Sequence, residues 1–327
     1  MLEENDVVES EWLIKLAKYK TGLLLLQFLA RRSFKKKKMS SSSSSSTACF
    51  VNPPLSSLTT VYIYTPRISN VRHGLSLSTQ FDKQDDKVVE HYYTRKSLHF
   101  WDKFYKRHKN KFFKDRHYLE KDWGKYFCEN DAKSPNGKVV LEVGCGAGNT
   151  IFPLVAAYPK LFVHACDFSS QAVSLVKSHA SFSDDRIDAF VCDVAKDDLC
   201  VKIKPSSVDV VTLIFLLSAV SPNNMPLVLQ NLKGVLKPSG HILLRDYAFG
   251  DSSQVKLQSR DQIISENFCF HGDGTCSFYF SEDFLSSLFE SAGFKIVDVN
   301  TYCRQMENHS KNITMCRRWV RAVFSQV

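Results

Sequence analysis

From residue 138 onward, short apolar runs alternate with segments of helical spacing, and this alternation restricts the fold more than any other feature of the chain. Alternating strands and helices form a parallel sheet covered on both faces. The last two apolar runs have no helix between them, so they must pair antiparallel. We therefore predict an α/β fold with a seven-stranded, mostly parallel sheet and an antiparallel last strand, with strands at 138–146, 161–169, 188–194, 208–217, 240–247, 294–302 and 319–327.

The first of these strands ends in a glycine-rich turn, Glu142-Val143-Gly144-Cys145-Gly146-Ala147-Gly148. Glycines at a turn from strand to helix let the backbone approach a ligand closely. In dinucleotide-binding folds the following helix receives a pyrophosphate. Here an acid opens the motif, which suits the cationic amino-acid end of S-adenosylmethionine. Glu142, Gly144, Gly146 and Gly148 are therefore candidate cofactor residues.

Two further acids end the next two strands. Asp167 follows Gly148 by nineteen residues, where such folds hold a ribose diol. Asp193 ends the third strand, where a carboxylate can accept a hydrogen bond from an adenine amino group. Together with Glu142 they favour an S-adenosylmethionine site in a Rossmann-like class I methyltransferase fold. A nucleotide-binding or non-binding Rossmann relative is the alternative.

The segment 91–127 interleaves aromatic side chains with lysine and arginine. Trp101, Tyr105 and His108 have helical spacing, so we predict a helix in this N-terminal extension. Aromatic and basic side chains together can stack on bases and contact phosphates. The alternative is an amphipathic helix that packs its aromatic stripe on the main domain, and one helix can do both.

The first 80 residues differ in composition from the rest. No acid occurs between Glu11 and Asp82, while this stretch contains the lysine run 35–38 and the serine run 40–46. Such a composition is typical of a mitochondrial or plastid transit peptide, and a disordered tail on a cytoplasmic protein is the alternative. The chain thus divides into 1–80, a basic and aromatic segment at 81–136, and a methyltransferase domain at 137–327.

Composition also restricts the partners. The net charge of +9 suits a polyanion such as RNA without requiring one. The ten cysteines include no C-x-x-C pair, so we predict buried free thiols, no metal site and no disulfide framework. The apolar run 22–30 is far shorter than the roughly 20 residues needed to span a bilayer, and we expect no membrane partner.

A set of motifs extends from about residue 83 to the C-terminus: HFWDKFYKRH, KFFKDRHYL, LEVGCGAGN, CDFS, CDVAKDDL, SVDVVTLIFLLSAVSP, VLQNLKGVLKPSG, LLRDYAFGD and ENF…GDGT. This set resembles the eukaryotic tRNA N3-methylcytidine methyltransferases. Small-molecule methyltransferases lack the first two motifs. The resemblance implies S-adenosylmethionine as cofactor and a tRNA cytidine, which we place in the anticodon loop, as substrate.

The resemblance also implies roles for particular residues. Trp101 and Tyr105 would close over the cofactor, and further cofactor residues would be Gly144, Asp167, Asp193 and Ile214. The basic segment would contact tRNA, and the candidates are Lys106, Arg107, Lys114 and Arg116, with Arg245 and His271 later in the chain. A partner protein such as a tRNA synthetase is used in this family. The oligomeric state stays open.

The implied reaction needs little acid–base chemistry. N3 of cytosine carries a lone pair and no proton, so no general base is required, and the product is a cation. We expect catalysis from positioning and from a nearby negative charge. Asp246, at the end of the fifth strand, is the candidate for that charge, and an ion pair with Arg245 is its alternative role. The base must leave its loop to be reached.

One segment departs from the family pattern. Where the family usually reads Tyr-Val-Arg-Gly-Asp-Gly-Thr-Arg, this chain reads Cys269-Phe270-His271-Gly272-Asp273-Gly274-Thr275-Cys276. Histidine and cysteine do not supply the permanent, bidentate charge of arginine. The alternative functions are therefore a methyltransferase of a protein or small molecule, and a catalytically weak relative that binds RNA or a partner.

Overall fold

The computed structural model describes residues 82–128, 137–308 and 313–326, all within one compact unit at 74–327. The expectations for residues 1–80 lie outside these ranges. No helix in the described ranges is long and apolar enough to cross a membrane, and the same ranges contain no cluster of three or more His, Cys, Asp or Glu able to hold a metal ion.

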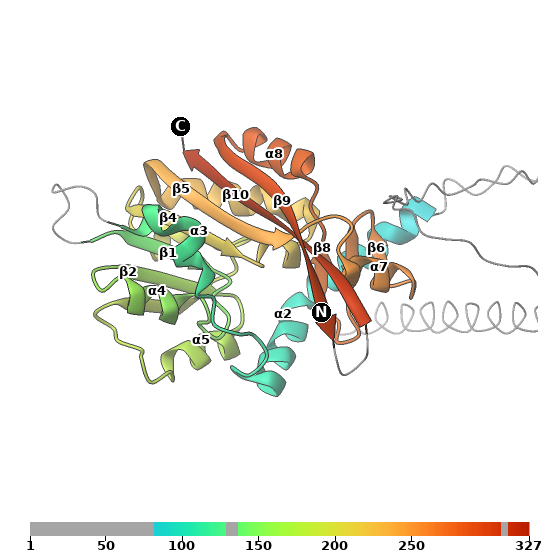
Figure 1. Ribbon diagram of the computed structural model, residues 1–327, viewed down its shortest axis with the longest axis horizontal. Coiled ribbons are helices and arrows are strands. Elements are labelled where there is room, and N and C mark those ends of the chain that lie inside the picture. The colour runs from blue at the N-terminus through green and yellow to red at the C-terminus, as the bar shows by residue number, and fades with distance from the viewer. Residues whose placement is uncertain (1–81, 129–136, 309–312, 327) are drawn as a thin grey trace, which may run out of the picture. The chain divides into compact units, whose positions relative to one another are not determined.

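The main sheet has seven strands in the order β3-β2-β1-β4-β5-β10-β9 (Figure 1). Neighbouring strands from β3 to β5 pair in parallel, and β10 pairs antiparallel with both β5 and β9. The predicted fold class and the antiparallel last strand are confirmed. The strands are β1 (Val139–Val143), β2 (Phe162–Asp167), β3 (Ile187–Val191), β4 (Val208–Ile214), β5 (Leu236–Tyr247), β9 (Phe294–Asn308) and β10 (Ile313–Gln326).

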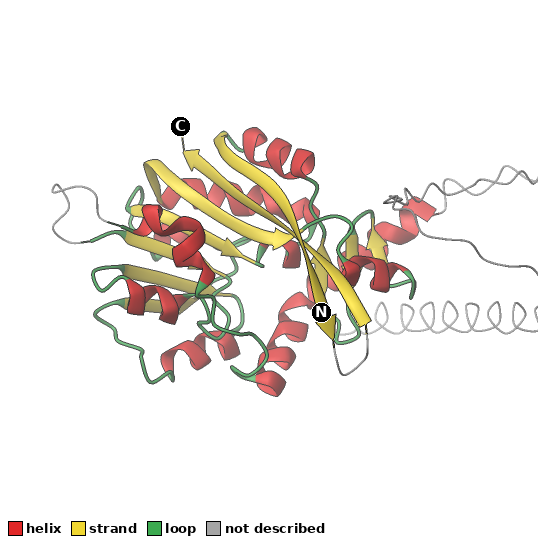
Figure 2. Ribbon diagram, viewed as in Figure 1, coloured by secondary structure: helices red, strands yellow, loops and turns green. Residues whose placement is uncertain are grey.

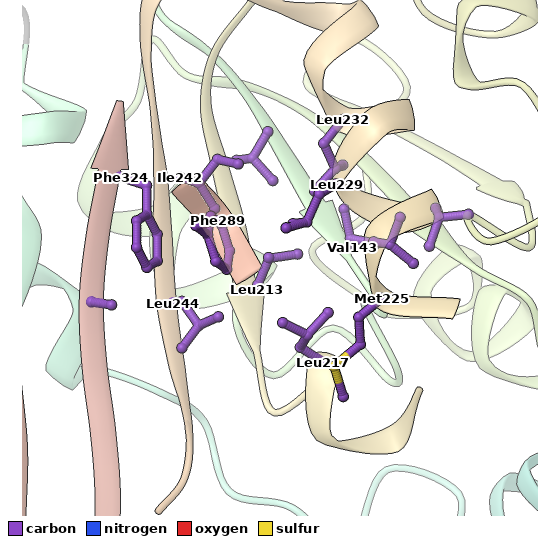
Figure 3. Packing of buried hydrophobic residues seen from close by; sticks show 14 of the residues in the cluster. Val143, Leu213, Leu217, Met225, Leu229, Leu232, Ile242, Leu244, Phe289 and Phe324 are labelled. Atoms are coloured by element: carbon purple, nitrogen blue, oxygen red, sulfur yellow. The ribbon is translucent and has the colours of Figure 1, made fainter. Parts of the chain in front are cut away.

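Helices cover both faces of this sheet (Figure 2). On one face, side chains such as Val140 and Val210 pack against α3 (Tyr118–Phe127), α4 (Ile151–Ala157) and α5 (Ser170–Lys177). Their strand neighbours Leu141 and Val211 pack on the other face, against α6 (Met225–Val235) and α8 (Glu282–Ser291). Successive residues of a strand point to opposite faces, so this core is built by strict alternation. Figure 3 shows part of the second cluster, in which Leu229, Leu232 and Phe289 pack near Leu213, Ile242 and Leu244.

Hydroxyl side chains start two of the helices that pack on the sheet. The Ser169 hydroxyl accepts a hydrogen bond from the N–H of Ala172 at the start of α5, and the Ser281 hydroxyl accepts one from Phe284 at the start of α8. Each satisfies a backbone donor that the helix itself leaves unpaired. A further helix, α7 (Ser252–Gln258), was not predicted.

The N-terminal extension forms the long helix α2 (Asp82–His108), which contains the predicted helical residues. A small sheet that was not predicted, β6 (Ile263–Ser265), β7 (Phe268–Phe270) and β8 (Cys276–Phe278), packs against it. The rings of Tyr93 and Phe270 stack with their centroids 4.8 Å apart. Gly274 lies so close to Phe100 that a Cβ there would be 2.4 Å from the ring. Strands of three residues are too short to show the alternation of apolar and polar residues by which a strand is predicted from sequence.

Cys303 and Cys316 form a disulfide between β9 and β10, so the prediction of free thiols is wrong for this pair. In the antiparallel register Cys303 lies opposite Arg318 and Cys316 opposite Gln305. The two cysteines are therefore diagonal neighbours, with Cα atoms 6.5 Å apart, which is within disulfide reach. The other cysteines in the described ranges are free thiols.

Candidate functional site

A cavity lies between α2 and the carboxyl ends of β1 to β4. It encloses about 1030 Å³, a volume that includes open solvent at its mouth. Ends of neighbouring parallel strands meet at one edge of a sheet, and the helix brings aromatic residues to the same place. Five of the predicted cofactor residues line this cavity, namely Trp101, Tyr105, Gly144, Asp167 and Asp193.

The glycine turn forms a wall in which side chains have no room. Gly144 and Gly146 have φ angles of +69° and +54°, a region that residues with a Cβ rarely adopt. A Cβ at Gly144 would lie 2.5 Å from the side chain of Leu216, and one at Gly146 would lie 2.7 Å from the hydroxyl oxygen of Tyr105. Gly144 itself lines the cavity, whereas Gly146 and Gly148 shape the turn behind it.

Asp167 ends β2 with its carboxylate buried at the cavity wall. Its Oδ2 accepts a hydrogen bond from the N–H of Gly146 at 3.0 Å, and its Oδ1 accepts one from Ser169 at 2.9 Å. Burial raises the pKa of Asp167 to about 6, although the two N–H bonds lower it. A carboxylate has about four acceptor positions, so Asp167 can still accept hydrogen bonds from a ribose diol.

Asp193, just after β3, is more open to solvent. Its Oδ2 lies 2.7 Å from the ammonium of Lys196, and its Oδ1 accepts a hydrogen bond from the N–H of Ala195 at 3.2 Å. Lys196 and Ala195 also line the cavity. The carboxylate is thus held in a fixed orientation at the end of the cavity formed by β3.

Two aromatic rings of α2 close the cavity from the side opposite the strands. Trp101 and Tyr105 are stacked with their ring centroids 6.0 Å apart. Between them in sequence, Asp102 accepts a hydrogen bond from the Ser169 hydroxyl at 2.5 Å, which attaches α2 to the turn after β2. Burial, followed by the nearby charge of Asp167, raises the pKa of Tyr105 well above its usual value.

Glu142 and Ile214, both predicted cofactor residues, do not line the cavity. The side chain of Glu142 is buried and is hydrogen-bonded to the hydroxyls of Thr212 and Thr150. Burial raises the pKa of Glu142 to about 7. Ile214 belongs to the core that faces α3 and α4. Val143, the strand neighbour of Glu142, does line the cavity, although its side chain packs into the buried core against α6.

Asp246, the predicted catalytic carboxylate, is fully buried and does not line the cavity. Its Oδ2 accepts a hydrogen bond from the N–H of Ser218 at 2.9 Å, and its Oδ1 accepts one from Tyr247 at 2.8 Å. Burial raises the pKa of Asp246 to about 6. The alternative pairing with Arg245 is not found either, because Arg245 lies 3.5 Å from Asp122. Asp246 therefore connects β5 to the loop after β4.

The predicted RNA-binding residues are in two settings. Lys106, Arg107 and Lys114 are exposed at the end of α2 and in the following loop, where phosphates can reach them. Arg245 is different, because its guanidinium carbon lies 3.8 Å from the ring centroid of Tyr118 and the side chain is largely buried.

The other two candidates also pack on the fold. The guanidinium carbon of Arg116 lies 4.8 Å from the ring centroid of Phe215. The Nε2 of His271 lies 2.9 Å from the hydroxyl of Ser277, and burial lowers the pKa of His271. Cys276, the second altered position of this segment, is buried in the cavity wall.

Several cavity residues were not predicted. Phe215 and Leu216 follow β4 directly, but this strand was predicted to extend to residue 217, so the strand-end reasoning that selected Asp167 and Asp193 did not select them. Other residues reach the cavity from α2, of which only Trp101 and Tyr105 were predicted to line it, and from the small sheet, which was not expected. These are Tyr93, Thr94, Phe268 and Cys276.

The chemistry of the cavity fits S-adenosylmethionine. Its hydroxyl and amino groups need acceptors, which Asp167 and Asp193 provide at the ends of adjacent strands. Its sulfonium is a cation, which aromatic rings such as Trp101 and Tyr105 attract. Gly144, which has no side chain of its own, lines the cavity next to Leu216.

Comparison with known proteins agrees with this chemistry. A family model described as a methyltransferase domain matches residues 141–242. The solved SAM-dependent methyltransferase of Anabaena variabilis is similar in fold, with a TM-score of 0.52 and 14% identity, over 70% of this chain and 95% of its own.

Curated relatives are closer in sequence. The tRNA N(3)-methylcytidine methyltransferase trm141 of Schizosaccharomyces pombe is 37% identical over 75% of this chain and 98% of its own length. The tRNA N(3)-cytidine methyltransferase METTL6 of Homo sapiens is 40% identical over 68% of this chain and 78% of its own. METTL2 of Xenopus tropicalis, with the same described activity, is 38% identical over 71% and 78%. The chain therefore belongs to the family of tRNA N(3)-cytidine methyltransferases.

Proposed function

We propose that this chain is an S-adenosylmethionine-dependent methyltransferase that forms N3-methylcytidine in tRNA. The observation that carries the proposal is the cavity, in which Asp167, Asp193 and Gly144 lie opposite Trp101 and Tyr105. These residues come from separate motifs of the family and meet in one site. The exposed basic residues beside the cavity supply a surface for a polyanionic substrate.

When bound, S-adenosylmethionine supplies an activated methyl group. The task of the chain is then to position the acceptor nitrogen, since N3 of cytosine already carries a free lone pair. The reaction has no need of a general base, and in the described ranges Asp167 and Asp193 are the only carboxylates in the cavity wall, where their oxygens already accept hydrogen bonds. Aromatic side chains and the exclusion of water are the main contributions left to the protein.

Negative charge behind the cavity suits a reaction that creates a cationic base. Asp167 and Asp246 are both buried, at the ends of β2 and β5. Fixed charges of this kind act strongly where water is excluded. In this proposal Asp246 acts from behind the loop after β4 and does not touch the base.

More specifically, we propose that the substrate is a cytidine in the anticodon loop. Unpaired loop bases can be turned out and held between side chains, whereas a base in a duplex must first be unpaired. The exposed Lys106, Arg107 and Lys114 then contact the flanking phosphates. We propose a tRNA synthetase or another protein as a partner. Such a partner would recognise features of the tRNA that lie outside this loop.

Residues 1–80 act, in this proposal, as a transit peptide for mitochondria or plastids. The support is the absence of acidic residues between Glu11 and Asp82 together with the lysine and serine runs. A fusion of residues 1–80 to a fluorescent protein should enter one of these organelles, and diffuse cytosolic fluorescence would refute the proposal. A chain that starts near residue 81 should keep full methyl transfer in vitro.

Labelled S-adenosylmethionine and total tRNA test the activity directly. After incubation and digestion to nucleosides, the label should elute with N3-methylcytidine. Label in another nucleoside, or in protein only, would contradict the proposed substrate. Cofactor binding without transfer, despite tRNA binding, would identify a catalytically weak relative.

A further inference from the structure

Phe215, the first residue after β4, has a backbone conformation that is unusual for a large side chain. Its φ angle is +57°, in the left-handed region where a bulky residue is an outlier. Such conformations persist only where the surroundings enforce them, and they are concentrated at functional sites. Here this residue lines the cavity.

Strand β5 holds the turn that contains Phe215 through two hydrogen bonds. The N–H of Phe215 donates to the carbonyl of Arg245 at 2.9 Å. Three residues later, the N–H of Ser218 donates to the buried carboxylate of Asp246 at 2.9 Å. The two acceptors are neighbours on β5, so the strand fixes the loop at the point where Phe215 enters the cavity.

Two side chains fix the ring itself. The guanidinium carbon of Arg116 lies 4.8 Å from the Phe215 ring centroid, and the Tyr247 ring centroid lies 4.9 Å away with the planes tilted by 48°. The N–H of Arg116 donates to the carbonyl of Asn149 at 2.9 Å, which attaches this arginine to the end of the glycine turn. The ring is therefore held in one position before any ligand binds.

The order of the strands separates Phe215 from the cofactor acids. In the sheet order β3-β2-β1-β4, the strand ends present Asp193, Asp167, Gly144 and Phe215 in succession. The acids that suit the adenosine hydroxyl and amino groups lie at the ends of β3 and β2. The end of β4 is the next position along this edge, on the other side of the glycine turn, and it offers a flat apolar ring in place of an acid.

From this arrangement we infer that Phe215 is the surface against which the target cytosine is held for methyl transfer. The inference rests on the proposed function, because it assumes a tRNA base as acceptor. Stacking suits this acceptor because a base has two π faces and an aromatic ring accepts either. Arg116, Tyr247 and Asp246 act as positioning residues, which hold the ring without contacting the base.

The test uses one purified tRNA that accepts the labelled methyl group and whose methylated position has been mapped. It compares two forms of this tRNA, one with cytidine and one with an abasic ribose at that position. Wild-type protein should bind the cytidine form about 10- to 100-fold more tightly, since stacking of this kind is worth that factor per base. In Phe215→Ala this difference should fall to about twofold or less. Phe249→Ala, a change of the same type at an exposed position outside the cavity, should keep the full difference.

Three further measurements exclude a purely structural role. S-adenosylmethionine affinity, measured by calorimetry, should be the same in Phe215→Ala and wild type. Phe215→Tyr should restore both methyl transfer and the preference for the cytidine form. Phe215→Leu keeps apolar bulk without a flat ring, so it should behave like Phe215→Ala, and it replaces that variant if alanine prevents folding.

The outcomes separate the inference from the proposed function. If wild-type protein transfers no methyl group to tRNA, the proposed function fails. If wild type methylates tRNA and Phe215→Ala weakens binding of both RNA forms equally, the inference alone is overturned. Wild-type binding that does not distinguish the two forms overturns it as well, and so does full activity of Phe215→Leu.

Discussion

The buried carboxyl group of Glu142 should make the protein less stable as the pH rises, and replacing it with glutamine should remove this effect. Burial raises the pKa of Glu142 from its usual 4.5 to about 7. Between these values the folded state keeps a proton that the unfolded chain releases. The contribution of Glu142 to stability is therefore fully present below pH 4.5 and is lost as the pH rises through about 7.

The size of the effect follows from the pKa difference. One pKa unit corresponds to 1.36 kcal/mol, so the full loss is about 3 kcal/mol, most of which falls between pH 5 and pH 8. Glutamine has the same shape and does not titrate. For a protein of this size, Glu142→Gln should raise the melting temperature relative to wild type by about 5–10 °C more at pH 8 than at pH 5.

Thermal unfolding at both pH values measures this difference. The amide in Glu142→Gln could form a weaker hydrogen bond to Thr212 or Thr150 than the carboxyl group does. Such a loss lowers the melting temperature of the variant equally at both pH values, so the comparison cancels it. The same comparison cancels the other buried carboxyls, which both proteins share. Asp185→Asn, at an exposed position, controls for the loss of a negative charge. If the difference in melting temperature between Glu142→Gln and wild type is the same at pH 5 and pH 8, the reasoning is refuted.

Two further predictions concern the ligands. Asp167→Asn keeps the shape of the side chain but loses its charge. It should lower S-adenosylmethionine affinity by about tenfold or more, because hydrogen bonds to charged groups contribute about 1.5–3 kcal/mol each. If calorimetry shows an unchanged affinity, Asp167 does not bind the ribose. Lys106→Glu combined with Arg107→Glu should weaken tRNA binding and reduce its salt dependence by about one unit per lost phosphate contact. Filter binding over a range of salt concentrations tests this, and an unchanged slope would contradict it.

The strand–helix alternation, the glycine turn and the acids at strand ends could all be predicted from the sequence. Each is a local pattern, and one topological rule connects them, because the carboxyl ends of adjacent parallel strands meet at one edge of the sheet. For this reason Gly144, Asp167 and Asp193 could be brought together without coordinates. Ser281 was likewise predictable as a helix start, since its hydroxyl acts on a backbone N–H only three residues away.

Other features depended on contacts between segments that are far apart in the sequence. The three-residue strands β6 to β8 are held by their packing on α2, and the pairing of Cys303 with Cys316 depends on a register that only the folded ribbon shows.

The tertiary structure also decided which side of a strand faces the cavity. Glu142 and Asp246 lie at the predicted strand ends, yet both carboxylates are buried away from the cavity, whereas Phe215 enters it through a left-handed turn. A pattern of residue types does not show to which side of the sheet a given side chain points. The direction is set by what packs against each face.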